Sequence, residues 1–167
     1  MDFLKYVRIF CVAFCLPFVW STKVYVATVD SAITPPTLSY INTTIQRAEQ
    51  NNAQAVIIKL DTPGGLLTTT RDIGQRILTS RIPVITYVSP QGARAASAGT
   101  FILYASHIAA MAPSTHLGSA TPISLGANEE EQSSAAEAKV LNDSIAYIKT
   151  LAEYHNRNQD FAIEAVQ

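Results

Sequence analysis

The sequence predicts an α/β domain built on a mainly parallel sheet. Short β-branched and apolar runs alternate along the chain with segments of helical periodicity, and most runs end in a turn rich in glycine, proline or other small residues. This alternation favours parallel strands joined by right-handed crossover helices. The 167 residues are 48% hydrophobic and 15% charged, which suits one domain with a substantial core. Sites in such sheets lie at the carboxyl ends of the strands.

Charge and composition exclude several classes of partner. Twelve basic and thirteen acidic residues give a net charge of −1, and no basic block is present, so we expect no nucleic-acid partner. The acidic run at 129–131 has no histidine at a metal-binding spacing, and we interpret it as a solvated face. We therefore expect no metal site and no cofactor.

Residues 1–21 are typical of a secretory signal. Lys5 and Arg8 precede an apolar run at 9–20, which is too short for a comfortable membrane span. An uncleaved signal anchor is the alternative interpretation. Both cysteines lie inside this leader, so residues 22–167 carry no disulfide and no thiolate metal site.

The first strand–helix–strand unit begins at 23–29, a β-branched and aromatic run that predicts a strand. Thr34 followed by the prolines at 35–36 predicts the cap and first turn of a helix, where a missing N–H costs little. The apolar stripe of that helix consists of Leu38, Ile41, Ile45 and Ala48. A second buried strand is predicted at 54–60.

A turn with two adjacent glycines, Asp61-Thr62-Pro63-Gly64-Gly65, ends this second strand. Thr69 and Asp72 have the spacing of a capping box, which predicts that the next helix starts there. A third strand follows at 83–88. We interpret Asp61 as a structural residue at the strand end rather than a catalytic one.

The small-residue stretch at 92–100 follows the third strand and contains Ser97. We predict a tight turn here and a helix that starts near Ser97. Small neighbours let other backbone approach the hydroxyl, and the free N–H groups of a helix start suit an oxyanion. An acyl-transfer serine needs this layout, although close helix–strand packing is the commoner reason for such a stretch.

The last third of the chain starts with a predicted strand at 107–113. A polar loop at 114–133 follows, of a length typical of a lid, a binding loop or a disordered segment. Ser134 and Glu137 have capping-box spacing and predict a helix start. The predicted core positions of this helix are Ala138, Leu141, Ile145, Ile148 and Ala152. Lys139 lies off that stripe, and by itself indicates a solvated lysine.

Four segments together resemble a known family. These are Asp61–Gly65, Ala96–Thr100, the Met111-Ala112-Pro113 run with Gly118–Ala120 shortly after it, and the helix that carries Lys139. The combination resembles the N-terminal ClpP-class serine protease domain of the NfeD family, which is related to signal peptide peptidase A. The resemblance runs from about residue 23 to the end, and it implies a ClpP/crotonase-like fold of stacked βα units.

The resemblance also implies site residues. Ser97 matches the family nucleophile, and Lys139 matches its general base. Gly65 and Ala98 are expected to donate oxyanion N–H groups, with Gly64 beside them. A lysine acts as a base only when its amine is neutral, so its pKa must fall from about 10.4. A helix N-terminus favours that change because it disfavours a cation.

Three other interpretations stay open. His116 could pair with Ser97, as in a ClpP-like Ser–His peptidase, although we interpret it as a surface histidine. Crotonase-type acyl-CoA enzymes share the implied fold and its paired oxyanion N–H groups. Finally, the chain could be a truncated, inactive scaffold that binds membrane proteins.

The resemblance also implies a substrate, an oligomeric state and a cellular location. The expected partner is a polypeptide substrate with apolar segments, such as a stomatin-like membrane protein, and assembly as a homodimer or larger is expected. We expect an exported protein at the periplasmic or extracytoplasmic face of the membrane. Residues 22–167 would form the protease domain, without the strand–helix segment that closes this domain in the family.

Overall fold

The computed structural model describes residues 22–122 and 134–167. Its centre is a four-stranded sheet in the order β1-β2-β3-β5, and every neighbouring pair is parallel. The strands are β1 (Val24–Asp30), β2 (Ala55–Asp61), β3 (Val84–Val88) and β5 (Ile108–Met111). The predicted α/β fold with a parallel sheet is therefore confirmed.

A second, two-stranded sheet was not predicted. It pairs β4 (Arg94–Ala96) with β6 (His116–Gly118) in parallel. An isolated bridge between Thr62 and Ala95 connects the turn after β2 to this small sheet. The small sheet therefore holds together the three segments that follow β2, β3 and β5.

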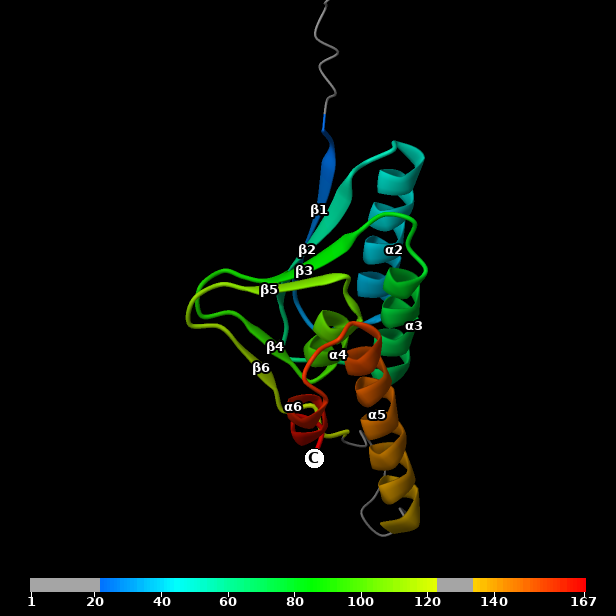
Figure 1. The fold of residues 1–167 in the computed structure, drawn as a ribbon, viewed down its shortest axis with the longest axis vertical. Helices are drawn as coiled ribbons and strands as arrows, with labels where there is room; N and C mark the ends of the chain where they lie inside the picture. The colour runs from blue at the N-terminus through cyan, green and yellow to red at the C-terminus, as the bar shows by residue number, and fades with distance from the viewer. Residues whose placement is uncertain (1–21, 123–133) are drawn as a thin grey trace, which may run out of the picture.

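Figure 1 shows α2 and α3 next to each other along one side of the main sheet, with α4, α5 and α6 in the lower part of the view. The helices of the described residues are α2 (Pro35–Gln50), α3 (Leu67–Leu78), α4 (Ala98–Ala105), α5 (Ser134–Tyr154) and α6 (Gln159–Glu164). All eight residues of α4 are buried. One core cluster joins the sheet to α2, α3 and α4, and a second joins α4 to α5 and α6, so α4 belongs to both.

The start of α2 agrees with the prediction. Thr34 is the N-cap, prolines occupy the first two helical positions, and the Thr34 N–H donates to Thr37 Oγ1 at 3.3 Å. Of the predicted stripe, Ile41, Ile45 and Ala48 are fully buried, and Leu38 packs partly buried against the same core.

The start of α3 differs from the prediction, and the capping box proposed for Thr69 and Asp72 is wrong. The helix begins at Leu67, because the Leu66 carbonyl accepts the Thr70 N–H at 2.9 Å and the Thr70 hydroxyl at 2.8 Å. Thr69 therefore lies inside the first turn, where its side chain is only 3% exposed. The chain thus enters the helix almost directly from the Gly-Gly turn.

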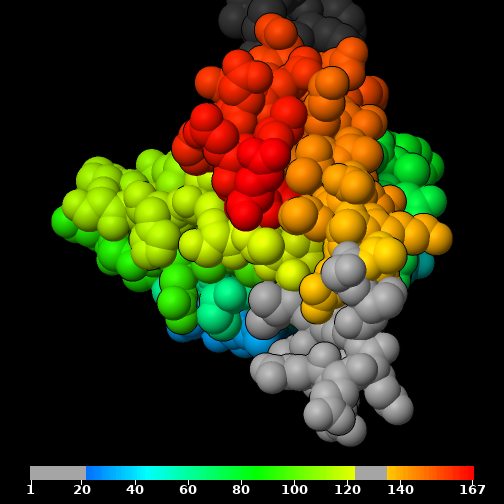
Figure 2. All heavy atoms as spheres, turned by 90° about the horizontal axis from the view of Figure 1, so that it is seen from below, coloured from blue at the N-terminus to red at the C-terminus, as the bar shows by residue number. Residues whose placement is uncertain are grey.

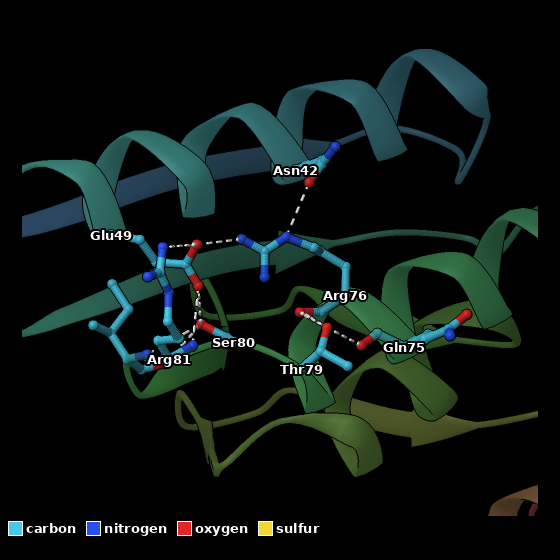
Figure 3. Close-up of polar contacts among 8 residues, drawn as sticks. Asn42, Glu49, Gln75, Arg76, Thr79, Ser80 and Arg81 are labelled. Atoms are coloured by element: carbon cyan, nitrogen blue, oxygen red, sulfur yellow. Dashed lines mark hydrogen bonds and ion pairs between the residues drawn. The ribbon is translucent and has the colours of Figure 1, made fainter.

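A charged cluster joins α2 to α3 and the loop after it (Figure 3). The Glu49 side chain is only 8% exposed and accepts hydrogen bonds from the Arg76 guanidinium at 2.8 Å and the Arg81 N–H at 3.0 Å. Arg76 Nε also donates to Asn42 Oδ1 at 2.9 Å. Burial alone raises the pKa of Glu49, but these hydrogen bonds and the charges of both arginines outweigh it, and the net pKa is lowered.

The predicted core stripe of α5 is confirmed from Leu141 onward, because Leu141 and Ile145 pack partly buried against the second core cluster. Ile148 and Ala152 are fully buried, whereas Ala138 is exposed, so its assignment to the core is wrong. Figure 1 shows the first turns of α5 extending past α4 and α6, beyond the elements that cover its later turns. No helix in the ranges 22–122 and 134–167 is both long enough and apolar enough to cross a bilayer. The predicted leader at 1–21 and the acidic run at 129–131 lie outside these ranges.

Candidate active site

Ser97 lies between β4 and α4, on a strained turn. Its φ of 50° and ψ of −115° form a backbone conformation that residues with side chains rarely adopt. The Ser97 N–H donates to the Gly118 carbonyl at 2.9 Å, and the Ala96 N–H donates to the Thr62 carbonyl at 3.1 Å. The small sheet therefore imposes this conformation on the serine from both sides.

The Ser97 hydroxyl does not cap the helix that follows. Ser97 is the N-cap residue of α4, a position where a serine side chain ordinarily accepts a hydrogen bond from the first helical turn. Here the side chain makes no capping bond. Within the described part of the chain the hydroxyl has no hydrogen-bond partner at all, so it is available to another group.

Ser97 opens into a cavity of about 960 Å³. The loop after β1, the Gly-Gly turn with the start of α3, the segment at 119–122 and one residue of α5 form its walls. Its apolar lining consists of Ile33, Pro63, Leu66, Leu67, Phe101, Ala120, Pro122 and Val140. A concave, largely apolar cavity with a few convergent polar groups is the usual form of a ligand site.

Two main-chain N–H groups beside Ser97 are unpaired among the described residues. Gly65 bridges Ile33 in parallel: the Ile33 N–H donates to the Gly64 carbonyl at 2.8 Å, and the Leu66 N–H donates to the Ile33 carbonyl at 3.0 Å. In this pattern the N–H of Gly65 itself points away from Ile33. The Ala98 N–H is the first of the free donors at the start of α4. Both residues line the cavity.

Both residues of the Gly-Gly turn must be glycine for steric reasons. Gly64 has a φ of +119°, and a Cβ there would lie 2.6 Å from Ser97 Cβ and 3.0 Å from its Oγ. A Cβ on Gly65 would lie 2.1 Å from the Ile33 carbonyl oxygen. A side chain at either position would therefore displace the serine or break the bridge to Ile33.

Two buried threonines hold the turns around Ser97, and the sequence analysis did not identify either. Thr62 Oγ1 donates to the Ser31 carbonyl at 2.7 Å, and the Gly64 N–H donates to the same hydroxyl at 3.2 Å. Thr100 Oγ1 donates to the Ala95 carbonyl at 2.9 Å and accepts the Gly118 N–H at 3.0 Å. Their positions next to the Gly-Gly turn and the serine were the one available signal.

Lys139 lies in the second turn of α5, and its side chain is exposed. The next residue, Val140, lines the cavity. Within the ranges 22–122 and 134–167, the Lys139 ammonium makes no hydrogen bond or ion pair, and it does not contact Ser97. The structure thus brings together Ser97, Ala98 and the two glycines, and it leaves Lys139 at the cavity's border.

None of the three histidines lines the cavity. His116 is exposed on β6, and the Val84 N–H donates to His107 Nδ1 at 3.2 Å. His155 donates from Nε2 to the Ala105 carbonyl at 3.0 Å. Burial lowers the pKa of His155, and the charge of Arg157 adds to that effect. These positions give Ser97 no histidine partner among the described residues.

The structural role predicted for Asp61 is confirmed, because its carboxylate accepts the Arg94 N–H at 3.0 Å. In residues 22–122 and 134–167, no group of three histidine, cysteine, aspartate or glutamate side chains could hold a metal ion.

Ser119 was not identified as a candidate. It lines the cavity and has a φ of 49°, so its backbone is strained like that of Ser97.

Comparison with known proteins gives a family match over most of the chain. The family model described as "NfeD1b, N-terminal domain" matches residues 23–167. The membrane-bound protease PH1510 of Pyrococcus horikoshii is 47% identical over 150 residues, covering 90% of this chain and 34% of the relative. The membrane protein NfeD1b of Bacillus subtilis strain 168 is 33% identical over 141 residues, covering 84% of this chain and 30% of the relative. The chain thus spans about a third of the length of these curated relatives.

Solved structures of a similar protein share the fold. A serine-to-alanine variant of the 1510-N membrane-bound stomatin-specific protease has a TM-score of 0.81 at 46% identity, covering 89% of this chain and 72% of that chain. A lysine-to-alanine variant of that protease, in complex with a substrate peptide, has a TM-score of 0.79 at 46% identity, covering 87% and 66%.

Proposed function

The chain belongs to the NfeD1b N-terminal domain family, and from this premise we propose that it is a serine endopeptidase with Ser97 as nucleophile. The observation that carries the proposal is the setting of Ser97. Among the described residues, its hydroxyl has no hydrogen-bond partner and stands on a strained turn that opens into an apolar cavity. Two glycines and a helix N-terminus, whose first N–H groups are unpaired among the same residues, lie beside it. The relatives named as proteases agree with this proposal.

In the proposed reaction, Ser97 Oγ attacks the carbonyl carbon of the scissile peptide bond while its proton passes to a neutral Lys139 amine. The Gly65 and Ala98 N–H groups donate to the oxygen that becomes negative. The protonated lysine then gives its proton to the departing amine, which leaves an acyl-enzyme on Ser97. Water, deprotonated by the same lysine, hydrolyses that ester and restores the enzyme.

Two observations support Lys139 as the base. Its neighbour Val140 lines the cavity, so the start of α5 borders the space in which a substrate would lie. The Lys139 side chain is exposed and pairs with no carboxylate in the described part of the chain, so it is free to turn toward a bound substrate. A solved structure of a lysine-to-alanine variant of the similar protease, in complex with a substrate peptide, agrees with such a role.

The proposed substrate is an apolar stretch of a membrane-associated polypeptide. The cavity walls are mainly aliphatic, so side chains of that kind would bury apolar surface there. The similar solved protease is described as stomatin-specific, and we propose a stomatin-like protein as the substrate. We further propose that residues 1–21 direct the domain to the extracytoplasmic face, and that it works as a dimer or larger assembly.

The test is covalent labelling combined with peptide cleavage by the full chain. A fluorophosphonate probe should modify Ser97, and cleavage of an apolar peptide should be lost in both Ser97→Ala and Lys139→Ala. His116→Ala should keep wild-type activity. Cleavage that survives Lys139→Ala and disappears in His116→Ala would replace the dyad with a Ser–His pair. Peptide binding without any labelling would instead indicate a non-enzymatic scaffold.

A further inference from the structure

The far end of the serine helix carries an unusual set of contacts. The last carbonyl groups of an α-helix have no partner within the helix. In α4, two side chains from the turn between α5 and α6, those of Arg157 and His155, donate to four consecutive carbonyls. The acceptors are the carbonyls of Leu103, Tyr104, Ala105 and Ser106.

Arg157 makes most of these contacts and is itself fixed. Its Nη2 donates to the Ser106 carbonyl at 2.6 Å, while its Nη1 donates to the carbonyls of both Leu103 and Tyr104. The guanidinium also lies over the Tyr104 ring, 5.9 Å from its centroid. The Arg157 main-chain N–H donates to the Ala152 carbonyl at 2.7 Å, which anchors the residue to the end of α5.

Arginine is suited to this position for reasons of charge and shape. The C-terminal end of a helix carries partial negative charge, so a cation there is favourable. A guanidinium presents its donors as a rigid planar fork, whereas a lysine ammonium is a compact point charge. Here the two terminal nitrogens of the fork reach three carbonyls at the helix end at the same time.

The length of α4 connects this contact to the candidate site. The helix has eight residues and therefore spans about 12 Å. Its N-terminal end carries Ser97 and the Ala98 N–H, and its C-terminal end lies against Arg157. An axial shift of so short a helix moves both ends by the same amount, and a tilt about its middle moves both ends by similar amounts.

We propose that Arg157 is a positioning residue, which sets the alignment of Ser97 and the Ala98 N–H by holding the C-terminal end of α4. This inference rests on the proposed peptidase function. Arg157 does not line the cavity and would not contact the substrate. It acts through the helix.

The same C-terminal segment also supports a wall of the cavity. The Ala120 N–H donates to the Ala165 carbonyl at 2.7 Å, and Ala162 and Val166 pack in one cluster with Phe101 and Ala120. Figure 2 shows this segment lying against α5 and against the residues that lead into the cavity wall. Residues 155–166 therefore contact both the helix that carries the serine and the loop opposite it.

The experiment compares Arg157→Ala and Arg157→Lys with Arg76→Ala in the full chain. Arg76 is a matched control, because its guanidinium also bridges two elements, α2 and α3, and its hydrogen bonds go to Asn42 and Glu49 of α2 and not to α4. Arg157→Ala should lower kcat on an apolar peptide about tenfold or more, as a misplaced nucleophile does. KM should change less than about twofold, because the walls from the Gly-Gly turn and α3 are untouched. Arg157→Lys should recover only part of the loss.

The Arg76→Ala control distinguishes a loss of Ser97 alignment from a general loss of stability. Arg76→Ala should lower the melting temperature by a comparable amount and keep wild-type kcat at temperatures where it is folded. The proposal is overturned if folded Arg157→Ala keeps wild-type kcat, or if Arg76→Ala loses as much. If Arg157→Ala does not fold, Arg157→Lys carries the same comparison.

A measurement without substrate distinguishes this inference from the proposed function. Amide hydrogen exchange within α4 should accelerate in Arg157→Ala and stay unchanged in Arg76→Ala. A wild-type chain that neither cleaves peptide nor reacts with the probe would refute the peptidase proposal. Faster exchange in α4 of Arg157→Ala would still show that Arg157 stabilises the position of that helix. Unchanged exchange in α4 of Arg157→Ala would refute the positioning role whatever the activity.

Discussion

The two members of the proposed dyad lie in opposite surroundings. Ser97 is enclosed by contacts from several segments: the Gly118 carbonyl accepts its N–H, Gly64 packs against its side chain, and α4 starts directly after it. Lys139 is exposed on a turn of α5 that extends beyond the packed part of that helix, and it has no polar partner in the described part of the chain.

This difference indicates how the two residues would be prepared for chemistry. A nucleophile on a strained turn must be held by many contacts, because its conformation costs about 1–3 kcal/mol. A lysine base must instead lose solvent to become neutral, and exposure works against that. The described fold therefore fixes the position of the nucleophile. The removal of solvent from the lysine, by contrast, depends on what covers the start of α5 when substrate is bound.

The largest expected effect on labelling comes from adding one methyl group to Gly64, the residue that packs against the Ser97 side chain. Gly64→Ala places a Cβ within 2.6 Å of Ser97 Cβ at a φ of +119°, so the serine must move. Fluorophosphonate labelling should fall about a thousandfold or more, on the scale of a lost catalytic alignment. Ala138→Gly, on the exposed turn beside Lys139, should leave labelling within about twofold after correction for stability. Normal labelling in folded Gly64→Ala would show that Ser97 is less constrained than its contacts indicate.

A substitution of Lys139, the proposed base, should lower the rate of peptide cleavage without changing the stability of the fold. Lys139→Arg keeps the charge and the exposed position but cannot give up a proton, because the pKa of arginine is above about 12. Peptide cleavage should fall about a hundredfold or more, within the range attributed to general-base catalysis. The melting temperature should stay the same, since Lys139 makes no hydrogen bond or ion pair with any described residue. Cleavage at the wild-type rate would remove Lys139 from the mechanism.

An intermediate effect is expected from Thr100, which holds the turn around Ser97. Thr100→Val keeps the side-chain shape but leaves the Gly118 N–H without its hydroxyl partner, at a cost of about 1–3 kcal/mol. Chemical denaturation should detect this loss, and labelling should slow about tenfold. Thr150→Val is the matched control, because that hydroxyl bonds only to the Ala146 carbonyl on an exposed helix face. Its stability should stay within about 0.5 kcal/mol of wild type. Equal effects of the two substitutions would contradict the role of Thr100.

The smallest effect concerns the charged cluster between α2 and α3, far from either dyad member. Because the folded pKa of Glu49 is lowered, its contribution to stability is fully present above the unfolded value of about 4.5. It is lost as the pH falls through the lower folded pKa. Screening by solvent limits it to about 1 kcal/mol or less. The melting temperature of wild type should fall more steeply below pH 5 than that of Glu49→Gln, and parallel curves would refute the assignment.

Much of the site followed from local sequence. The turn before Ser97, the helix after it and the Gly-Gly turn at a neighbouring strand end were all predicted, because each depends on residues adjacent in the chain. The failures have a common cause. Thr69 and Asp72 have the spacing of a cap, yet the Leu66 carbonyl starts α3 earlier. Ala138 matches a helical stripe, yet no element among the described residues buries it.

The sequence by itself determined the order of the four main strands and of helices α2 to α5, the parallel sheet and the position of Ser97 at the start of a helix. These depend on side-chain periodicity and turn chemistry over a few residues. Only the tertiary structure decided that Gly64 touches Ser97, that Gly65 bridges Ile33, and that Arg157 holds the far end of α4. Such contacts join residues more than 30 positions apart, and their partners become neighbours only after the intervening chain has packed.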